Sequence, residues 1–408
     1  MNTLQKITHF LTEEIPKLQR VEKFDGPLMF ARSKRLLGML GNPQNTHKAI
    51  HAAGTSGKGT VCYMIDAILR AHNKRTALLV SPHVYDIRER IQINHQYAPE
   101  KQYIKAANLV ISCAREMARE GDAPSYYEVM AAISFLLSSQ KSLDYTVVET
   151  GLGGKYDLSN TVKTENKYCV LTQIGLDHTQ ILGTTYEQIA AEKAEILYPR
   201  APVTALLQKD SVNQVFEHIA KKYDARISWV EPFGNYEVDD LLLALDATRN
   251  VAERDGWLFN EELARDAAQT VYIPGRFEKR TLSDHLVILD GAHNPQKLRA
   301  LASRLERESH SPATIMLALG EYNDYEGSLR AIKGVCKQLI VCEFFLESSV
   351  RRRAISSTKI AEAAQRMGFT DVITQPAPHL ALQEALTNPE PIVVTGSFYL
   401  LGEVDRSF

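Results

Sequence analysis

Short apolar runs alternate along this chain with longer segments whose apolar residues recur at helical spacing. The apolar runs predict strands at Ala77–Val80, Tyr145–Glu149, Tyr168–Ile174, Val203–Leu207, Leu286–Leu289, Thr314–Leu319, Leu339–Cys342 and Ile392–Val394. Several runs are apolar on both faces, as parallel strands covered by helices require. Helical spacing marks intervening segments, including Glu128–Ser138, Tyr186–Leu197 and Gln296–Leu305. This alternation predicts a doubly wound α/β fold.

A domain boundary is predicted near the turn Tyr272-Ile273-Pro274-Gly275-Arg276, because the second set of strands begins soon after it. We therefore expect an N-terminal domain over residues 1–275 and a smaller C-terminal domain over residues 276–408. A site built between two such domains suits a reaction with several substrates.

The run Ala53-Gly54-Thr55-Ser56-Gly57-Lys58-Gly59-Thr60 follows a strand-like segment and precedes an apolar helical pattern. Backbone N–H groups in such a turn, with the helix N-terminus behind them, can cradle phosphates. Lys58 would supply charge to the outer phosphates, and Thr60 a hydroxyl near a magnesium ion. The alternative is a tight strand-to-helix turn whose lysine is simply solvated.

Two further strands end in polar residues, where ligands bind in open α/β sheets. Glu149 is followed by the glycine-rich run 150–157, and an acid there commonly holds magnesium beside a nucleotide's phosphates. The glycines would let a substrate approach the backbone closely. Equally, Glu149 would serve as a helix cap or pair with a surface lysine. The next strand leads to Asp177 and His178, a pair that suits either a ligand or a structural role.

Turn residues supply the remaining candidates. Arg276 lies at the expected hinge, where its planar fork would clamp a phosphate. Asp290 would accept hydrogen bonds from a ribose, and His293 would reach phosphate or a developing charge; ordinary turn chemistry explains both as well. Lys193, between Glu192 and Glu195, has the pattern of a solvated helical face.

Composition narrows the function classes. The formal net charge of −2 gives no electrostatic case for nucleic acid or an anionic membrane, and no apolar stretch approaches the roughly 20 residues of a membrane span. The N-terminal residues lack the layout of a secretion signal. The 5 cysteines show no paired metal-ligand spacing, which indicates reduced thiols and a cytoplasmic location.

These motifs together resemble the folylpolyglutamate synthase and dihydrofolate synthase family of the Mur-type ligase superfamily. The resemblance is collinear from about Leu37 to Leu400. The segments that carry it are the glycine-rich loop, Ser81–Ile91, Glu149 with its glycines, Gly175–Thr179 with Glu192–Ala194, Pro274–Phe277 and Asp290–Pro295.

The resemblance implies a P-loop-containing N-terminal domain, a smaller Rossmann-like C-terminal domain, and ATP bound between them. It implies that a pteroate or folate carboxylate takes the γ-phosphoryl group of ATP, and that the amine of L-glutamate displaces phosphate from the acyl phosphate. Such a ligase belongs to folate biosynthesis and one-carbon metabolism. It would use one or two magnesium ions, small-molecule substrates and no nucleic acid or membrane partner, and it would be a cytoplasmic monomer.

Carried over to this chain, the resemblance also assigns roles to individual residues. Gly57, Lys58, Gly59, Thr60, Arg276 and Asp290 would contact the nucleotide; Ser81, Glu149 and His178 look like magnesium ligands; Lys58, Lys193 and His293 would be catalytic. Lys193 matches a lysine that is carbamylated in the family, and a carbamate would orient a second metal. The segments Ser125-Tyr126-Tyr127-Glu128 and Tyr156-Asp157-Leu158 correspond to the pterin pocket, although two aromatics at a helix start also suit a core.

The chain departs from the family pattern at two notable places. Asp240 stands where an ATP-contacting Asn is expected, and an acid there would repel phosphate or forfeit an amide donor. The usual Lys-Asp pair after Gly320 is absent. Two alternatives therefore stay open: a Mur-type ligase acting on a different acid, and a nucleotide-binding homologue that has lost catalysis.

Overall fold

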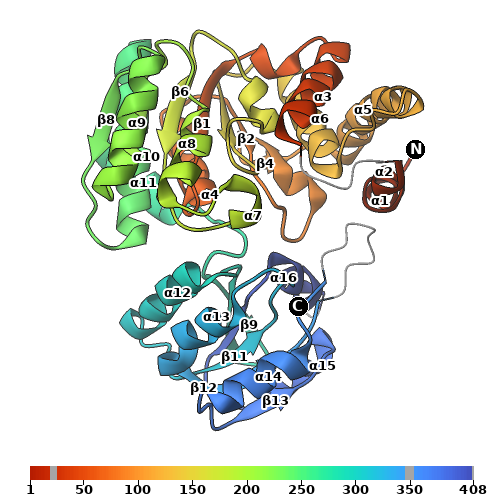
Figure 1. Cartoon of the computed structure of the whole chain (residues 1–408), viewed down its shortest axis with the longest axis vertical. Coiled ribbons are helices and arrows are strands. Elements are labelled where there is room, and N and C mark those ends of the chain that lie inside the picture. The colour runs from red at the N-terminus through yellow and green to blue at the C-terminus, as the bar shows by residue number, and fades with distance from the viewer. Residues whose placement is uncertain (19–24, 345–352, 407–408) are drawn as a thin grey trace. The chain divides into compact units, whose positions relative to one another are not determined.

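The computed structural model describes residues 1–18, 25–344 and 353–406 (Figure 1). The chain divides into two compact units. The first comprises Met1–Pro82 and Ile87–Tyr272, and the second comprises His83–Asp86 and Ile273–Phe408. The sequence placed the division after residue 275 and did not anticipate that the short segment 83–86 packs with the second unit.

The first unit is built on an eight-stranded sheet in the order β4-β3-β2-β5-β1-β6-β7-β8. Its strands are β1 (Lys48–Ala53), β2 (Thr76–Leu79), β3 (Ile91–Ile93), β4 (Gln96–Tyr97), β5 (Tyr145–Glu149), β6 (Tyr168–Leu171), β7 (Val203–Leu206) and β8 (Ile227–Val230). All neighbours are parallel except at the β2–β3–β4 edge, which is antiparallel. Short length and mixed polarity explain why the sequence pattern did not mark the edge strands.

Helices cover both faces of this sheet. They are α1 (Leu4–His9), η1 (Phe10–Glu14), α2 (Ile15–Leu18), α3 (Gly26–Met39), η2 (Pro43–Asn45), α4 (Lys58–Ala71), η3 (Ile87–Arg90), α5 (Glu100–Arg119), α6 (Tyr126–Ser139), η4 (Leu158–Thr161), α7 (Thr179–Leu182), α8 (Tyr186–Ala194), α9 (Asp210–Lys222), α10 (Tyr236–Asp255) and α11 (Glu261–Thr270). Ala49 and Ala53 of β1 share one face, because side chains alternate along a strand, and they pack in the clusters of α5–α6 and of α8–α9. Helices α4, α10 and α11 pack together and contact the sheet as a separate layer.

The second unit repeats the architecture at smaller size. Its sheet runs β13-β12-β11-β14-β10-β9, from β9 (Glu278–Leu282), β10 (His285–Asp290), β11 (Ala313–Leu317), β12 (Cys336–Val341), β13 (Val372–Thr374) and β14 (Ile392–Thr395). Only β9 is antiparallel. Its helices are α12 (Pro295–Arg307), α13 (Tyr325–Ile332), η5 (Lys333–Val335), α14 (Ser357–Arg366), α15 (Pro378–Ala385) and α16 (Phe398–Asp405).

The apolar strand residues divide between two clusters in this unit as well. Ile288 and Ile315 pack under α12–α14, whereas Val287 and Met316 pack under α15–α16. The predicted doubly wound α/β class, with a larger and a smaller unit, is confirmed.

Register brings the chemistry-bearing loops of the first unit to one edge. Ala52 pairs with Glu149, and Ala53 pairs with Leu171, so the carboxyl ends of β5, β1 and β6 are level. Strand order reverses at β1, because the chain proceeds from it to β2 on one side and β6 lies on the other. In open α/β sheets ligands bind at such a switch point.

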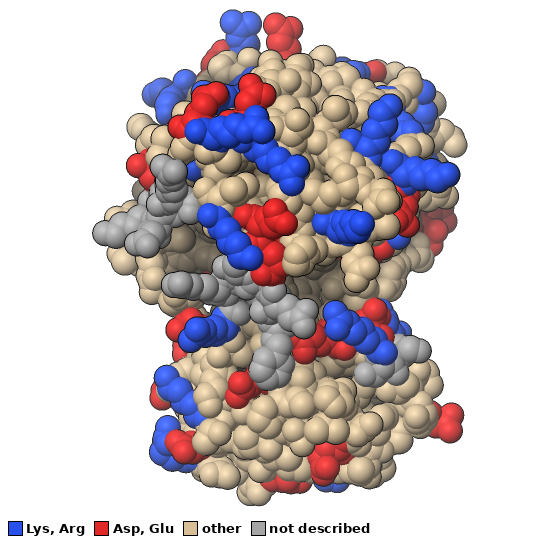
Figure 2. Space-filling model, turned by 90° about the vertical axis from the view of Figure 1, so that its right-hand side faces the viewer, with Lys and Arg blue, Asp and Glu red and all other residues tan. Residues whose placement is uncertain are grey.

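Charges of both signs occur together on the face that Figure 2 draws. Figure 2 shows basic and acidic side chains interspersed on the visible face of each unit, in keeping with the net charge of −2. Within the described ranges, no helix has the length and apolar character needed to cross a membrane.

Candidate active site

The glycine-rich loop connects β1 to α4 at the switch point. Gly57 is the N-cap of α4 and has φ +85°, a conformation that favours glycine. Lys58 folds back over the loop, its Nζ donating to the carbonyl of Gly54 at 2.8 Å. Gly59 and Thr60 follow in the first turn of the helix. The lysine is therefore engaged with the loop rather than simply solvated, and the helix N-terminus behind it provides N–H groups for an anion.

The loop after β6 fixes the shape of this turn. The Thr55 hydroxyl donates to Gly175 O at 3.1 Å and accepts from Gly175 N at 3.0 Å. Thr55 N donates to Gln173 O at 2.8 Å. A Cβ added at Gly54 would lie 1.8 Å from the Thr172 hydroxyl, so this glycine permits the close approach of the two loops. The phosphate-type loop is thus held by its neighbour before any ligand arrives.

Glu149 and Ser81 meet beside this loop. The Glu149 side chain is 9% exposed, and its Oε2 accepts a 2.8 Å hydrogen bond from Ser81 N. Its Oε1 lies 3.4 Å from the position a Cβ on Gly59 would occupy. A carboxylate and a hydroxyl residue at the start of a phosphate-type helix form a set of hard oxygen donors, which fits magnesium. The structure brings together two of the three predicted metal ligands.

The third predicted ligand comes from a different loop. His178 lies after β6, has φ +48°, and is the N-cap of α7. Its side chain is about half exposed and lies 3.9 Å from Asp177. Among the described residues, no group of three or more His, Cys, Asp or Glu side chains is close enough to hold a metal ion. A metal role for His178 stays a prediction.

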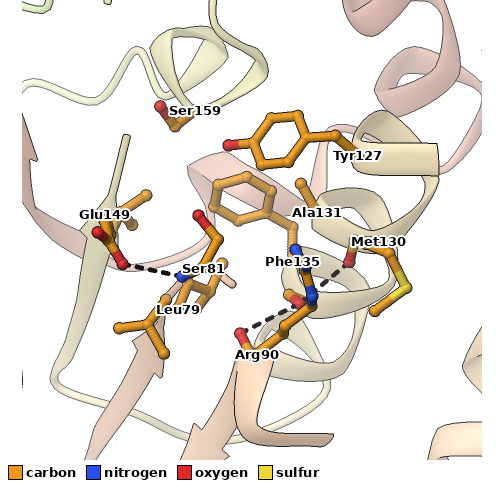
Figure 3. A pocket seen from close by; sticks show the side chains of 12 residues that line it. Leu79, Ser81, Arg90, Tyr127, Met130, Ala131, Phe135, Glu149 and Ser159 are labelled. Carbon is orange, nitrogen blue, oxygen red and sulfur yellow. Dashed lines mark hydrogen bonds between the residues drawn. The ribbon is translucent and has the colours of Figure 1, made fainter. Parts of the chain in front are cut away.

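A pocket opens next to Glu149 and Ser81 (Figure 3). It holds about 330 Å³ of empty space, part of it open to solvent. Its wall consists of Leu79, Val80, Ser81, Arg90, Tyr127, Met130, Ala131, Ser134, Phe135, Val148, Glu149 and Ser159. In Figure 3 the carboxylate of Glu149 is joined to Ser81 by a hydrogen bond, and Tyr127 of α6 lies across the pocket. An apolar floor, an aromatic ring and a buried guanidinium suit a flat, polar-edged ligand.

The residues of the predicted pocket segment 125–128 have different roles in the structure. Tyr127 lines the pocket, and the Arg90 guanidinium lies 5.5 Å from the ring centroid of Tyr126. Ser125 and Glu128 form a capping box at the start of α6. Glu128 is also paired with Arg32 at 2.8 Å, and both are nearly fully buried. Ser125 and Glu128 therefore have structural roles in these contacts. Substrate binding by either residue stays a prediction.

The segment 156–158 lies behind the pocket wall. Asp157 Oδ1 accepts from the Tyr127 hydroxyl at 3.0 Å and from the Ser159 hydroxyl at 2.5 Å. Tyr156 packs on α3, where a Cβ on Gly26 would lie 2.4 Å from its ring. Leu158 is buried in the core. Asp157 therefore holds two pocket residues in place.

His51, which the sequence did not single out, completes this network. Its Nε2 lies 2.9 Å from the hydroxyls of Ser159 and of Thr150. Because the Ser159 hydroxyl donates to Asp157, it accepts from His51, so Nε2 carries the proton. Burial, with Lys167 and Lys163 nearby, holds the pKa of His51 well below its usual value. A neutral imidazole on β1 thus supports the pocket wall, and its place on a buried strand leading into the loop was the available signal.

Two glycines after Glu149 let neighbouring helices pack closely on this loop, and the substrate approach expected from the sequence stays a prediction. A Cβ on Gly151 would lie 2.3 Å from the Tyr127 ring. A Cβ on Gly154 would lie 2.6 Å from Glu192 O in α8. Lys155 N donates to the same carbonyl at 2.9 Å. The glycines let α6 and α8 close on this loop.

This packing overturns the solvated-face prediction for Lys193. The side chain is 4% exposed, because the loop of Gly154 covers its helix. Glu195 does remain partly exposed and pairs with Lys222 at 2.7 Å. Local charge spacing was misleading because it cannot register what packs on a helix.

The second unit presents its own cluster at the carboxyl end of β10. Asp290 Oδ2 accepts from Phe277 N at 2.8 Å, and its Oδ1 accepts from Ala292 N at 2.9 Å. Burial raises the pKa of Asp290 above its usual value, while Arg276 and these two N–H groups oppose that rise. Asp290 therefore joins the Arg276 turn to the loop of His293, and its ribose contact stays a prediction.

The protonation of His293 follows from its partners. Lys297 Nζ lies 3.2 Å from Nε2, and Nδ1 lies 2.8 Å from Gly291 O. Since an ammonium only donates, Nε2 accepts and Nδ1 carries the proton. The His293 imidazole is thus held neutral beside a cation.

Asp240 of α10 reaches the glycine-rich loop. It is 7% exposed, and its Oδ1 lies 2.2 Å from the position a Cβ on Gly57 would occupy. An acid in contact with this turn places a negative charge where the sequence predicts phosphate. In the altered loop after β11, Asn323 Oδ1 accepts from Gly320 N at 2.8 Å and Asp324 caps α13.

Comparison with known proteins agrees with this arrangement. Residues 52–231 match the Mur ligase middle domain, and residues 275–398 match the Mur ligase, glutamate ligase domain. The dihydrofolate synthase/folylpolyglutamate synthase of Bacillus subtilis is 26% identical over 412 residues, covering 92% of this chain and 94% of that protein. The folylpolyglutamate synthase of Lacticaseibacillus casei is 27% identical over 410 residues, covering 91% and 92%.

A solved structure extends the likeness to the fold. The Mycobacterium tuberculosis folylpolyglutamate synthase complexed with ADP has a TM-score of 0.86 and 26% sequence identity, and the match covers 99% of this chain and 98% of that chain.

Proposed function

The chain belongs to the folylpolyglutamate synthase and dihydrofolate synthase family of Mur-type ligases, and we propose that it joins L-glutamate to a folate or dihydropteroate carboxylate at the expense of ATP. One observation carries the proposal above the others. A phosphate-type loop, the Glu149–Ser81 pair and a pocket with an aromatic wall lie at the same edge of one sheet. This arrangement supplies a phosphoryl donor site beside a site for a flat acceptor.

The reaction has two steps. An acceptor carboxylate oxygen attacks the γ-phosphorus of ATP; the O–P bond to the acceptor forms and the bond to the β-phosphate oxygen breaks, which releases ADP. The glutamate amine then attacks the acyl carbon, its nitrogen loses a proton, and inorganic phosphate leaves. Both steps develop charge on phosphate oxygens, so fixed donors and cations lower their barriers.

Residues of this chain fit these needs. Lys58 would leave the Gly54 carbonyl for the outer phosphates, and Gly57, Gly59 and Thr60 would present backbone and hydroxyl groups to them. Ser81 and Glu149 would hold magnesium, with His178 as the third ligand; the ion, when bound, neutralises phosphate charge. In the second unit, Arg276 and Asp290 would contact the nucleotide.

Two further assignments concern Lys193 and His293. A carbamate on buried Lys193 would convert a cation into an anion able to orient a second metal ion. His293, held neutral by Lys297 and Gly291, would meet the charge that develops on phosphate.

The pocket would take the pterin. Tyr127 offers its ring to the heterocycle, and Arg90 offers a cation. Asp157 would fix the Tyr127 hydroxyl. We further propose a cytoplasmic monomer that has small-molecule substrates and neither nucleic acid nor membrane as a partner.

The test is ADP release by the purified protein with magnesium, ATP and L-glutamate. Dihydropteroate, tetrahydrofolate and no acceptor are compared. We expect release that requires an acceptor, and the acceptor used distinguishes the two activities. A protein that binds ATP but releases ADP with neither acceptor would be a ligase for another acid or a homologue without catalysis.

A further inference from the structure

Phe398 lies where the two candidate turns of the second unit meet. It is the first residue of α16, shortly after the end of β14, and is 8% exposed. Its ring contacts both the Arg276 turn and the Asp290–His293 loop.

Both turns carry glycine where the ring needs room. A Cβ on Gly291 would lie 2.2 Å from Phe398 Cε1, and one on Gly275 would lie 3.2 Å from the same atom. Gly291 N donates to Gly275 O at 2.9 Å, which ties the turns together over the ring. Any side chain at Gly291 would displace either the ring or the loop.

The guanidinium of Arg276 lies over the face of this ring. Its Cζ is 4.3 Å from the ring centroid, a distance typical of a cation–π contact. Across residues 1–18, 25–344 and 353–406, no carboxylate forms an ion pair with Arg276. Its N–H donors therefore stay available to an anion, while the ring restricts where the group lies. The His293 ring meets the same phenylalanine by its edge, with centroids 6.3 Å apart and planes at 63°.

We propose that Phe398 is a positioning residue that pre-arranges Arg276, and with it His293, for the phosphate chain of the nucleotide. This inference rests on the proposed function only in taking Arg276 as a nucleotide contact. A long arginine side chain loses conformational freedom when it binds an anion. A ring that has already ordered it removes part of that cost, so the effect appears in nucleotide affinity.

The alternative is that Phe398 merely fills the core, since it also packs in the cluster under α15–α16. The two roles differ in their dependence on Arg276. A filler destabilises the unit whatever stands at position 276, whereas a positioning ring matters for affinity only while the guanidinium is present.

The experiment measures the dissociation constant of MgADP by calorimetry for the full chain. Phe398→Leu keeps an apolar side chain and removes the aromatic face, and we expect it to weaken binding about fivefold. Phe344→Leu is the matched control, because Phe344 is 4% exposed in the same cluster and its ring contacts Tyr399 rather than Arg276. Unchanged affinity in Phe398→Leu, or an equal loss in Phe344→Leu, would overturn the proposal.

A double-mutant cycle with Arg276→Met separates positioning from filling. We expect Phe398→Leu to have no further effect on affinity in the Arg276→Met background. Additive losses would show that the ring acts independently of the guanidinium. Arg276→Lys probes the same contact without touching the core, because an ammonium keeps the charge but loses the planar group that stacks. It should weaken binding in the wild-type background. Phe398→Leu should weaken binding less in the Arg276→Lys background than in the wild type, because an ammonium retains part of the cation–π contact.

This readout is independent of the acceptor. A wild-type protein that binds MgADP but ligates no folate would refute the proposed function and leave the cycle interpretable. A folate ligase whose cycle is additive would refute the inference alone.

Discussion

The backbone N–H of Ser81 donates a 2.8 Å hydrogen bond to Oε2 of Glu149, and this bond joins the ends of β2 and β5 beside the glycine-rich loop. Both carboxylate oxygens lie close to the loop, 3.4 and 3.5 Å from the position that a Cβ on Gly59 would occupy. The hydrogen bond from Ser81 thus orients a carboxylate that lies against the phosphate-type turn.

Glu149→Gln tests this arrangement. The amide has the same shape and its oxygen can still accept from Ser81 N, so the local structure should persist. Loss of the charge should lower ATP turnover by about 100-fold and raise the magnesium concentration needed for half-maximal rate. Steady-state ADP release across a magnesium titration measures both. Glu187→Gln, on the exposed first turn of α8, is the control and should match the wild type.

Lys58→Ala is expected to abolish ATP turnover and leave the fold intact. The ammonium donates to loop carbonyls of Gly54 and Thr55 rather than supporting the core, so the melting temperature should change little. Lys58→Arg should rescue poorly, because a planar fork does not replace a compact point charge in a tight loop. Wild-type turnover in Lys58→Ala would remove this residue from the site.

Asp240→Asn should strengthen nucleotide binding. The carboxylate abuts Gly57, and a negative charge near bound phosphates costs binding energy that an amide does not, while the amide adds a donor. We expect the MgADP dissociation constant to fall about threefold to tenfold, with the gap narrowing at high salt because ions screen the repulsion.

Asp246→Asn is the control for this variant. It lies on the same helix and changes the net charge equally, but its carboxylate accepts from Thr204 and Asn250, away from the loop. Weaker binding in Asp240→Asn would mean that the acid contributes favourably, for instance through a metal ion.

Some elements of the fold and of the site could be predicted from the sequence because their residue patterns depend directly on burial. A strand that is apolar on both faces is buried on both faces, so its sequence pattern marks it clearly. For this reason β5 was predicted at its observed bounds, 145–149, with Glu149 at its carboxyl end. The order of the motifs along the chain marked the glycine-rich loop and Glu149 as candidate site residues. Edge strands such as β3 and β9 are short or polar on one side and left no comparable pattern.

Contacts between distant segments were beyond the reach of local patterns. Lys193 was placed on a solvated face by its charged neighbours, yet Gly154, about forty residues earlier, packs on its helix and buries it. His51 and Phe398 were passed over for the same reason. Their roles depend on Ser159 and on Arg276, each more than a hundred residues away along the chain.

Lys193→Ala should cripple turnover and be partly rescued by an added short carboxylic acid. If Lys193 carries a carbamate, the acid replaces the missing anion in the space that the side chain leaves. Gly154→Ala is the matched comparison, because its Cβ would collide with Glu192 O and shift α8 without removing the lysine. That variant should also lose activity but gain nothing from the acid. An unaffected rate in Lys193→Ala would return the residue to a structural role.

We expect His51 to make the stability of the first unit decrease at acidic pH. Its pKa is held well below the usual value in the folded protein, by burial first and then by Lys167 and Lys163. Below a pH of about 6.5, His51 is therefore protonated in the unfolded chain but stays neutral in the folded protein. The unfolded state then carries more protons, so the free energy of unfolding falls as the pH falls, by up to about 1.4 kcal/mol per pH unit from this one group.

His51→Gln isolates that contribution. A glutamine amide can donate to Ser159 or Thr150 as the imidazole does, but it does not titrate. Urea unfolding of wild type and variant at pH 7.5, 6.5 and 5.5 gives the two slopes. We expect the variant to lose less stability on acidification, whatever its absolute stability. Replacement of the partly exposed His285 by Gln should leave the wild-type slope. Equal slopes for all three proteins would mean that the folded state accepts the proton on His51, contrary to the neutral network described.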